Sequence, residues 1–423
     1  GNLTAWDAFS TIISSIIGSG IFATPGLVYA QTGSPCASLL AWVMGGVLSF
    51  IGSLCYAELA TGDVDCGAEL AYFQKAFNRH VAFAFVFVSF FALASGSIAI
   101  EATVFSRYLL AIFDIDASIL NVAIAMGLVV FLGFLNLNGC QQSAMIQKAM
   151  VVFKVAAVLL LILGAIFAPA HARQGAKFDN LGTCWQGTVS STFGMGMLGS
   201  LWAYSGFNSI CALSEEFSNP QRDLPVGVTC GMIVVTILYV LSNVAYMLII
   251  PANVFKESRS VGYAFAISVG GTVYADLLSL LILMATAGAA HSTIFGSSRV
   301  FFAAGRDDLF SDRFKRLNSH GVPSYSIIAL CAWSCVLILL GEHLSSLIDY
   351  SGVATWFFAG LAAIAMIRLR ISTSETFHIP FYPITPLVFA TGCFALVISG
   401  LVDDFYPSLF VIILITASTL YHR

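Results

Sequence analysis

Four residues in the first apolar segment of the chain, Gly18 to Ile21, have the composition of a break in a helix. Ser19 stands between two glycines, and the pair Pro25 and Gly26 follows shortly after. Glycine weakens a helix through its backbone entropy, and proline removes a donor and clashes with the preceding turn. Such a break at membrane depth frees N–H and C=O groups, which are tolerated only where they are buried in protein or face water.

The freed groups of this segment have chemistry of their own. N–H groups at the start of a helix attract an anion, and carbonyl groups at the end of a helix attract a cation. A molecule with a carboxylate and an ammonium group on one carbon, as in an amino acid, would satisfy both. A helix that is only kinked or closely packed is the alternative interpretation, because glycine is common in membrane helices.

The composition places the whole chain in a lipid bilayer. Hydrophobic residues make up 58% and charged residues 9%, and the mean hydropathy is +0.90. Soluble proteins carry about 25% charged residues. The net charge of -4, with no basic run, argues against a nucleic-acid partner. The ten cysteines form no CxxC pair, so neither a metal site nor a disulfide framework is expected.

Hydropathy divides the chain into a series of apolar spans with short connections. The first apolar span has no cleavage site and is expected to be retained. Lysine and arginine concentrate in the loops on the side of the N-terminus, which predicts cytoplasmic termini in a plasma or inner membrane. We predict an all-α polytopic protein with twelve spans, near 5–30, 36–59, 80–112, 119–138, 144–168, 189–216, 227–250, 274–304, 324–341, 345–368, 384–401 and 405–421.

The sixth span, like the first, contains residues that would interrupt a membrane helix. Residues Ser200 to Ser209 place small and polar side chains at mid-membrane depth. The sixth span follows the first by an odd number of helices, so a second repeat that starts there would be inverted in the membrane. Interrupted helices at corresponding positions of two halves are typical of a transporter's central site. This coincidence favours a binding site over two unrelated kinks.

Three stretches resemble known signatures. Gly18–Phe22 is similar to the GSGIF motif of the amino acid–polyamine–organocation superfamily. Leu201–Asn208, followed by Glu215, Glu216 and Asn219–Pro225, resembles the sixth helix of its L-type amino acid transporter family. Gly296–Arg299 with Gly305–Asp308 resembles the eighth helix of that family and the loop after it.

The resemblance covers essentially the whole chain and implies a fold and an activity. The fold would be the five-plus-five inverted repeat known as the LeuT fold. Its first repeat would occupy residues 1–168, its second repeat 189–368, and two peripheral helices 384–421. The activity implied is sodium-independent exchange of amino acids by alternating access, without a cofactor. The partners would be the amino acid substrate and the lipid bilayer.

The resemblance also implies which residues bind the substrate. Its carboxylate would meet Ser19, Gly20 and Ile21, and its ammonium group would meet carbonyls near Ile17. Trp202 would close over the substrate. The full set expected at the site is Ile17, Gly18, Ser19, Gly20, Ile21, Trp202, Ala203, Tyr204, Ser205, Phe207 and Asn208.

Two departures from the family pattern affect substrate and partner. The family usually has tryptophan where Phe207 stands, which bears on side-chain preference. The vertebrate members carry a cysteine between helices 3 and 4 for a disulfide to a glycoprotein heavy chain, and residues 113–118 contain none. Cys184 lies in the next outer loop, so a disulfide-linked heavy chain is not expected; a non-covalent partner remains open.

Lys154, Glu101 and His291 are ionisable residues inside predicted spans, where a charge is costly and usually functional. Lys154 lies in an apolar run, and the resemblance places it where sodium-coupled relatives of the fold bind an ion. Glu101 is either a proton site, a site for a substrate cation, or a structural partner of a basic residue. His291 is either a proton carrier or, as the simpler interpretation, a hydrogen-bonded interior residue.

An amino acid exchanger is the leading hypothesis. A proton-coupled importer of amino acids or polyamines, using Glu101 or His291, is the alternative within transport. A channel or receptor is more distant, since no filter-like motif is present. An enzyme is not expected, because no catalytic triad, metal cluster or phosphate loop is found.

Overall fold

The protein was analysed as a computed structural model. The structure describes residues 3–403 apart from 63–67, 138–139, 176–183, 186–189, 210–216, 259, 341–343 and 371–376, together with residues 413, 415 and 416. The described residues are almost entirely helical, as the sequence predicts. The helices of the first half are α1 (Ala5–Ile16), α2 (Gly20–Ala23), α3 (Pro25–Thr32), α4 (Pro35–Thr61), α5 (Ala68–Ala76), α6 (Arg79–Val88), η1 (Ser89–Ala94), α7 (Ser95–Ile112), α8 (Ser118–Leu137) and α9 (Cys140–Ile166).

The second half follows a short 3-10 turn, η2 (Ala170–Ala172). It begins with another short helix and contains α14, whose two helical parts are separated by a kink at Gly271. Its helices are α11 (Phe193–Ala203), α12 (Pro220–Ile249), α13 (Ala252–Glu257), α14 (Val261–Arg306), α15 (Ser324–Leu340), α16 (Leu344–Leu369) and α17 (Ile384–Asp403).

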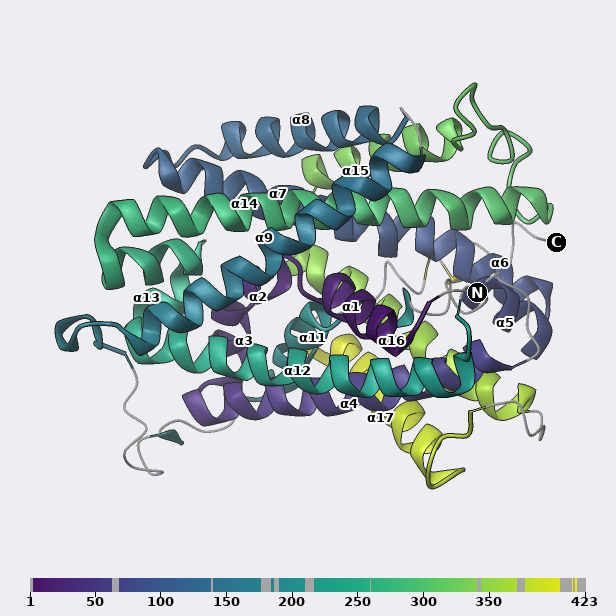
Figure 1. Ribbon diagram of the computed structural model, residues 1–423, viewed down its shortest axis with the longest axis horizontal. Coiled ribbons are helices and arrows are strands. Elements are labelled where there is room, and N and C mark those ends of the chain that lie inside the picture. The colour runs from purple at the N-terminus through teal and green to yellow at the C-terminus, as the bar shows by residue number, and fades with distance from the viewer. Residues whose placement is uncertain are drawn as a thin grey trace.

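The helices pack so that the interrupted ones lie near the centre. Figure 1 shows α1, α2 and α11 between two groups of long helices, with α9 and α14 on one side and α4 and α12 on the other. α14 packs along α9 and α7, while α12 packs along α1 and α4. The N-terminus and α5 lie at one end of the molecule, and α13 lies at the opposite end (Figure 1). The interrupted segments are therefore enclosed by continuous helices.

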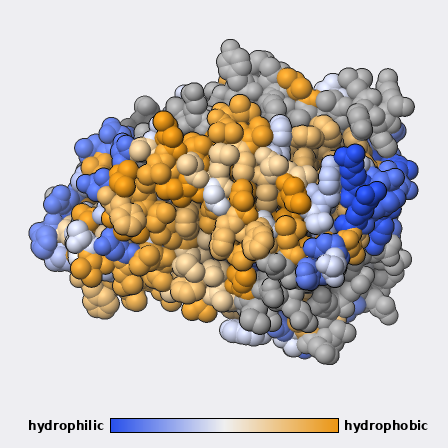
Figure 2. All heavy atoms as spheres, turned by 90° about the horizontal axis from the view of Figure 1, so that it is seen from above, coloured by the Kyte–Doolittle hydropathy of each residue, from blue (hydrophilic) through white to orange (hydrophobic). Residues whose placement is uncertain are grey.

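The outer surface has the pattern of a protein embedded in lipid. Figure 2 shows hydrophobic side chains across the middle of one face and polar side chains toward both ends. The lipid-facing side of α8 illustrates this, since Val130 and Phe134 are 63% and 62% exposed. Apolar side chains around a helical bundle whose backbone groups bond internally are what a bilayer requires. The chain is an integral membrane protein.

The predicted spans agree with the structure only in part. In the described part of the chain, nine helices are long and apolar enough to cross a membrane, and α15, with 17 residues, is shorter. The twelfth predicted span, 405–421, falls almost wholly outside the described residues. The eighth span was predicted to begin at residue 274. In the structure, Gly271 has a φ of 70° and is not helical, so it separates a short helical part that begins at Val261 from the long part that follows, and the predicted start lies close to this break. Only a residue without a side chain adopts that conformation easily, so the glycine allows the chain to turn between the two parts.

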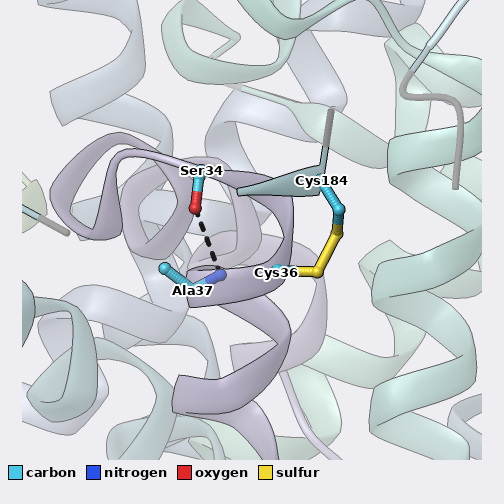
Figure 3. The surroundings of a disulfide bond; sticks show 4 residues. All are labelled: Ser34, Cys36, Ala37 and Cys184. Carbon is cyan, nitrogen blue, oxygen red and sulfur yellow. Dashed lines mark hydrogen bonds between the residues drawn. A yellow bond between two sulfur atoms is a disulfide. The ribbon is translucent and has the colours of Figure 1, made fainter. Parts of the chain in front are cut away.

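A disulfide bond corrects the expectation that no disulfide is present. Cys36 in the first turn of α4 is bonded to Cys184, which precedes α11 (Figure 3). Ser34 caps the same helix, because its Oγ accepts a hydrogen bond from the amide of Ala37 at 3.3 Å. The two cysteines are 148 residues apart in the sequence, so no local spacing predicts that they pair. Only the fold brings them together.

Candidate functional site

The interruption predicted in the first segment is present. α1 ends at Ile16, α2 begins at Gly20, and the residues between them are not helical. Ile17 adopts an extended conformation with ψ of 104°, which turns the chain out of the helix. Ile17 and Ile21 are fully buried, and Ser19 is 2% exposed. The broken backbone therefore lies inside the protein rather than against lipid.

Three amides at this break have no acceptor. The N–H groups of Ser19, Gly20 and Ile21 donate to no backbone or side-chain atom among the residues that the structure describes. The carbonyl oxygens are better satisfied, since Ser19 accepts from the amide of Phe22 at 3.1 Å and Gly20 accepts from the amide of Thr24 at 2.9 Å. Buried N–H groups without partners are rare and costly. The arrangement leaves a cluster of donors available to an anionic group.

The sixth predicted span is also interrupted. α11 ends at Ala203, and the chain continues through a turn into a 3-10 segment at residues 207–209. Gly206 has a φ of 111°, and a Cβ there would lie 2.6 Å from the carbonyl oxygen of Ser15. This close approach requires glycine. The hydroxyl of Ser209 donates to the hydroxyl of Ser15 at 2.8 Å, so the turn is fastened to α1.

The two breaks meet. A Cβ placed on Gly20 would lie 2.5 Å from the Cα of Ala203, so the start of α2 touches the end of α11. The hydroxyl of Tyr239 on α12 lies 2.9 Å from the carbonyl oxygen of Ile16 and 3.1 Å from that of Ala203. These are the last residues of α1 and α11, so one hydroxyl serves the freed carbonyl ends of both broken helices. Tyr239 was not predicted as a site residue, because a tyrosine in an apolar helix belongs to no motif that marks a binding site.

The remaining residues expected on α11 face different neighbours. Trp202 is almost fully buried. The hydroxyl of Tyr204 donates to the carbonyl oxygen of Trp42 at 3.1 Å, and the two rings lie 6.0 Å apart. Ser205 donates its hydroxyl to the carbonyl oxygen of Leu201 at 3.3 Å. The Tyr204 side chain thus packs against α4, and its ring also lies 5.0 Å from that of Tyr239.

Phe207 and Asn208 contact side chains of α4, α5 and α16. The ring of Phe207 packs against Tyr56 at 5.7 Å and Trp356 at 6.2 Å between ring centroids. The side-chain amide of Asn208 donates to the carboxylate of Glu69 at 2.9 Å. Sequence analysis missed Glu69, because it lies in a connection between spans and belongs to no motif that was recognised there.

Lys154 reaches the first break from α9. It is 4% exposed, and its Nζ donates to the carbonyl oxygen of Ser14 at 3.0 Å, near the end of α1. Glu101 on α7 is 8% exposed and accepts a hydrogen bond from the hydroxyl of Thr293 on α14 at 3.2 Å. The charges of Lys154 and Glu101 interact without forming an ion pair within 4.0 Å. α9, α7 and α14 therefore place a cation and a carboxylate close to the broken helix.

His291 occupies a separate place in the interior. Its ring is fully buried, and its Nδ1 lies 3.0 Å from the side-chain nitrogen of Asn136 on α8. Because an amide nitrogen only donates, Nδ1 is the acceptor in this bond. This agrees with the simpler interpretation of His291 as a hydrogen-bonded interior residue. Among the described residues, no group of histidine, cysteine and acidic side chains could hold a metal ion.

Comparisons with known proteins agree with this architecture. A family model described as amino acid permease matches residues 3–418. The human b(0,+)-type amino acid transporter 1 is 29% identical over 86% of this chain and 75% of its own length. The human cystine/glutamate transporter is 29% identical over 93% of this chain and 79% of its own length. The rabbit large neutral amino acids transporter small subunit 2 is 26% identical over 86% and 68%, respectively.

These relatives are transporters rather than enzymes, as the sequence predicts. They are L-type amino acid transporters, so the resemblance given by the motifs in the first, sixth and eighth spans is confirmed. The family match covers both broken helices and nearly all the helices around them. The chain belongs to the amino acid permease family.

Proposed function

We propose that the protein is a sodium-independent exchanger of neutral L-amino acids that works by alternating access. The observation that carries the proposal is the cluster of unpartnered, buried amides at Ser19, Gly20 and Ile21, next to the end of α11. The start of α2 offers unpartnered N–H donors, and the carbonyl ends of α1 and α11 lie next to it, so the two breaks in contact present positive and negative partial charges side by side. A zwitterion matches such a pair.

The substrate carboxylate would accept hydrogen bonds from the three amides. The substrate ammonium group would donate to the carbonyl ends of α1 and α11, near Ile17 and Trp202–Ser205. Tyr239 already lies against the carbonyls of Ile16 and Ala203, and a carbonyl oxygen has two lone pairs, so each accepts a second bond. Binding both poles through the backbone recognises any amino acid and leaves the choice of side chain to other residues.

Selection of neutral substrates would come from apolar side chains. Trp202 would cover the substrate, and Phe207 and Asn208 would shape the pocket together with Gly18, Ala203, Tyr204 and Ser205. The relatives carry names that state different substrates, which include cystine, glutamate and large neutral amino acids. A competition screen of all common amino acids against one labelled substrate identifies the side chain that this chain prefers.

Lys154 supports sodium independence. Its ammonium group donates to the carbonyl of Ser14 from the position where sodium-coupled relatives of this fold are expected to hold an ion. A permanent cation there stabilises the freed end of α1 without binding or releasing an ion during the cycle. No sodium gradient would then drive transport.

The fold and orientation complete the proposal. Residues 1–168 and 189–368 would form inverted repeats, with 384–421 outside them, and both termini would face the cytoplasm. The Cys36–Cys184 disulfide supports this orientation, because it lies near α3 and α13, away from the N-terminus, and disulfides persist in oxidising compartments. The membrane would be the plasma membrane or an inner membrane.

Counter-transport in liposomes tests the proposal. Purified protein is reconstituted into liposomes loaded with an unlabelled neutral amino acid, and uptake of the labelled amino acid is measured. Uptake should require amino acid inside and should not change when choline replaces sodium. Empty liposomes with protein, and loaded liposomes without it, are the controls. A requirement for sodium would contradict the proposal, and current without substrate would indicate a channel.

One observation favours a second candidate, the proton-coupled importer. Glu101 is a buried carboxylate that interacts electrostatically with Lys154 and accepts a hydrogen bond from Thr293. A carboxylate in this setting is a candidate proton site. An importer would accumulate substrate in empty liposomes when the outside is made acidic. Glu101→Gln would abolish that uptake, whereas an exchanger would show none to abolish.

A further inference from the structure

The carboxylate of Glu69 joins three separate parts of the chain. Its Oε1 accepts a hydrogen bond from the hydroxyl of Tyr56 on α4 at 2.8 Å and from the side-chain amide of Asn208 at 2.9 Å. Glu69 itself lies on α5, a short helix outside the membrane-spanning set that packs against α6 and α16. α5 lies at the end of the molecule that holds the N-terminus (Figure 1).

Asn208 connects this contact to the second break. It follows the end of α11 at Ala203 by one short turn, and the neighbouring Phe207 packs edge-on against Tyr56. Ser209 fastens the other side of the turn to Ser15 on α1. The turn at residues 207–209 is therefore held between α1 and α4, a few residues after the end of α11, which α2 contacts.

A path from the breaks to the N-terminal end requires this turn to separate from α4. The hydrogen bonds to Glu69 oppose that separation, because both would have to break. We propose that Glu69 is a positioning residue for transport: its carboxylate latches the 207–209 turn to α4 and keeps the site closed toward the N-terminal end. This inference rests on the transport function proposed above, since it assigns the turn a role in a cycle of opening and closing.

The structure supplies a matched set of variants. Glu69→Ala removes the acceptor, and Asn208→Ala removes the donor from the turn. Glu69→Gln keeps Oε1 as an acceptor and is the conservative rescue. Gln74→Ala is the control, because Gln74 is an exposed polar residue on the same helix.

The first measurement is amide hydrogen exchange of the detergent-solubilised protein without substrate. In Glu69→Ala and in Asn208→Ala, exchange at residues 204–209 should rise about tenfold, the size expected when one hydrogen bond to a charged group is lost. The double variant should show no larger rise than either single variant. Glu69→Gln and Gln74→Ala should remain close to wild type.

The second measurement separates a latch from a structural contact. The apparent KM for a neutral amino acid is measured at each face of oriented liposomes. Weakening the contact that closes the site toward the N-terminal end favours the conformation that is open to that side. The ratio of the two KM values should therefore shift in Glu69→Ala and return to the wild-type value in Glu69→Gln. A purely structural role would lower the amount of active protein and the maximal rate but leave this ratio unchanged.

The outcomes distinguish this inference from the proposed function. Absence of amino acid flux in the wild type overturns the proposed function, while the exchange measurement still tests whether Glu69 holds the turn. Flux with an unchanged KM ratio, or unchanged amide exchange at 204–209, overturns the latch. If Glu69→Ala fails to fold, Asn208→Ala provides the same two measurements.

Discussion

The start of α2 and the end of α11 approach so closely at Gly20 and Ala203 that even a methyl group does not fit between them. A Cβ on Gly20 would lie 2.5 Å from the Cα of Ala203, which is backbone and cannot rotate away. The glycine at this position therefore serves helix packing as well as ligand access. A substitution intended to block the ligand also separates the two broken helices.

Gly20→Ala and Gly18→Ala should consequently behave differently. Overpacking at Gly20 should destabilise the fold by about 1–3 kcal/mol, measured as a lower melting temperature in detergent. A Cβ on Gly18 would meet the Cβ of Ala289 at 3.6 Å and the carbonyl oxygen of Ile16 at 3.8 Å, both ordinary contacts, so Gly18→Ala should fold normally. Equal melting temperatures for the two variants would contradict this packing argument.

Tyr239→Phe should impair transport strongly. It leaves the carbonyls of Ile16 and Ala203 without their shared donor, and an unsatisfied buried group costs about 1–3 kcal/mol, or roughly tenfold or more in an equilibrium. Tyr246 on the same helix is the control, because its buried hydroxyl has no hydrogen-bond partner among the described residues. Tyr246→Phe should transport normally and be equally stable or more so. Similar exchange rates in both variants would exclude a special role for Tyr239.

Lys154→Ala should slow the transport cycle more than it weakens substrate binding. The lysine contacts the carbonyl of Ser14 rather than the amides of the first break, so it holds helices and not the substrate. Counter-transport gives the rate, and ligand-induced thermal stabilisation gives the affinity. The exposed Lys256→Ala is the control. Normal exchange by Lys154→Ala, or wild-type uptake that needs sodium, would remove Lys154 from the mechanism.

Phe207→Trp should change the ranking of substrates more than the overall rate. Phe207 is buried between Tyr56 and Trp356, so a larger ring there alters the shape of the neighbouring space. One methylene in an apolar pocket is worth about 1–3 kcal/mol in discrimination. Competition by small and large neutral amino acids measures the effect, and melting temperature reports any overpacking. An unaltered ranking in a stable variant would place Phe207 outside the pocket.

Mild acid should stabilise the docking of α5. Burial raises the pKa of Glu69 above its usual value, although the hydrogen bonds from Tyr56 and Asn208 act in the opposite direction. The folded state therefore holds the proton more tightly than the unfolded state, and stability decreases as the pH rises from the ordinary pKa of glutamate through the raised value. Amide exchange at residues 68–76, followed across this range, should increase with pH in the wild type beyond the intrinsic dependence of the chemistry. Glu69→Gln should lack that additional increase, and identical profiles would refute the assignment.

Some of this architecture could be predicted from the sequence because its causes are local. The break at Gly18–Gly20 follows from glycines in an apolar segment, and the break after α11 follows from small and polar residues at Ser200–Ser209. The depth of Lys154 follows from the apolar run around it. In each case, the residue type is energetically unfavourable in a helix or in a bilayer. Its presence in an apolar segment is therefore enough to predict a break or a buried charge.

The rest depends on contacts between distant segments. Nothing local marks Tyr239 as the residue that reaches both broken helices, or Glu69 as the partner of Asn208. The same holds for Cys36 and Cys184. Such pairs form only when distant helices pack against each other. A single sequence does not show which helices are neighbours.

The disulfide has a consequence for where the molecule can open. Cys36 follows the broken first helix, and Cys184 precedes the broken helix α11, so a covalent bond holds the two interrupted segments at one end of the bundle. At the other end, the same segments meet through non-covalent contacts, such as those of Ser15 with Ser209. Separating the two segments at the disulfide would require a covalent bond to break, whereas separating them at the other end requires only hydrogen bonds and packing contacts to break. The disulfide therefore restricts opening at its own end of the bundle and leaves the N-terminal end as the one where these segments can part.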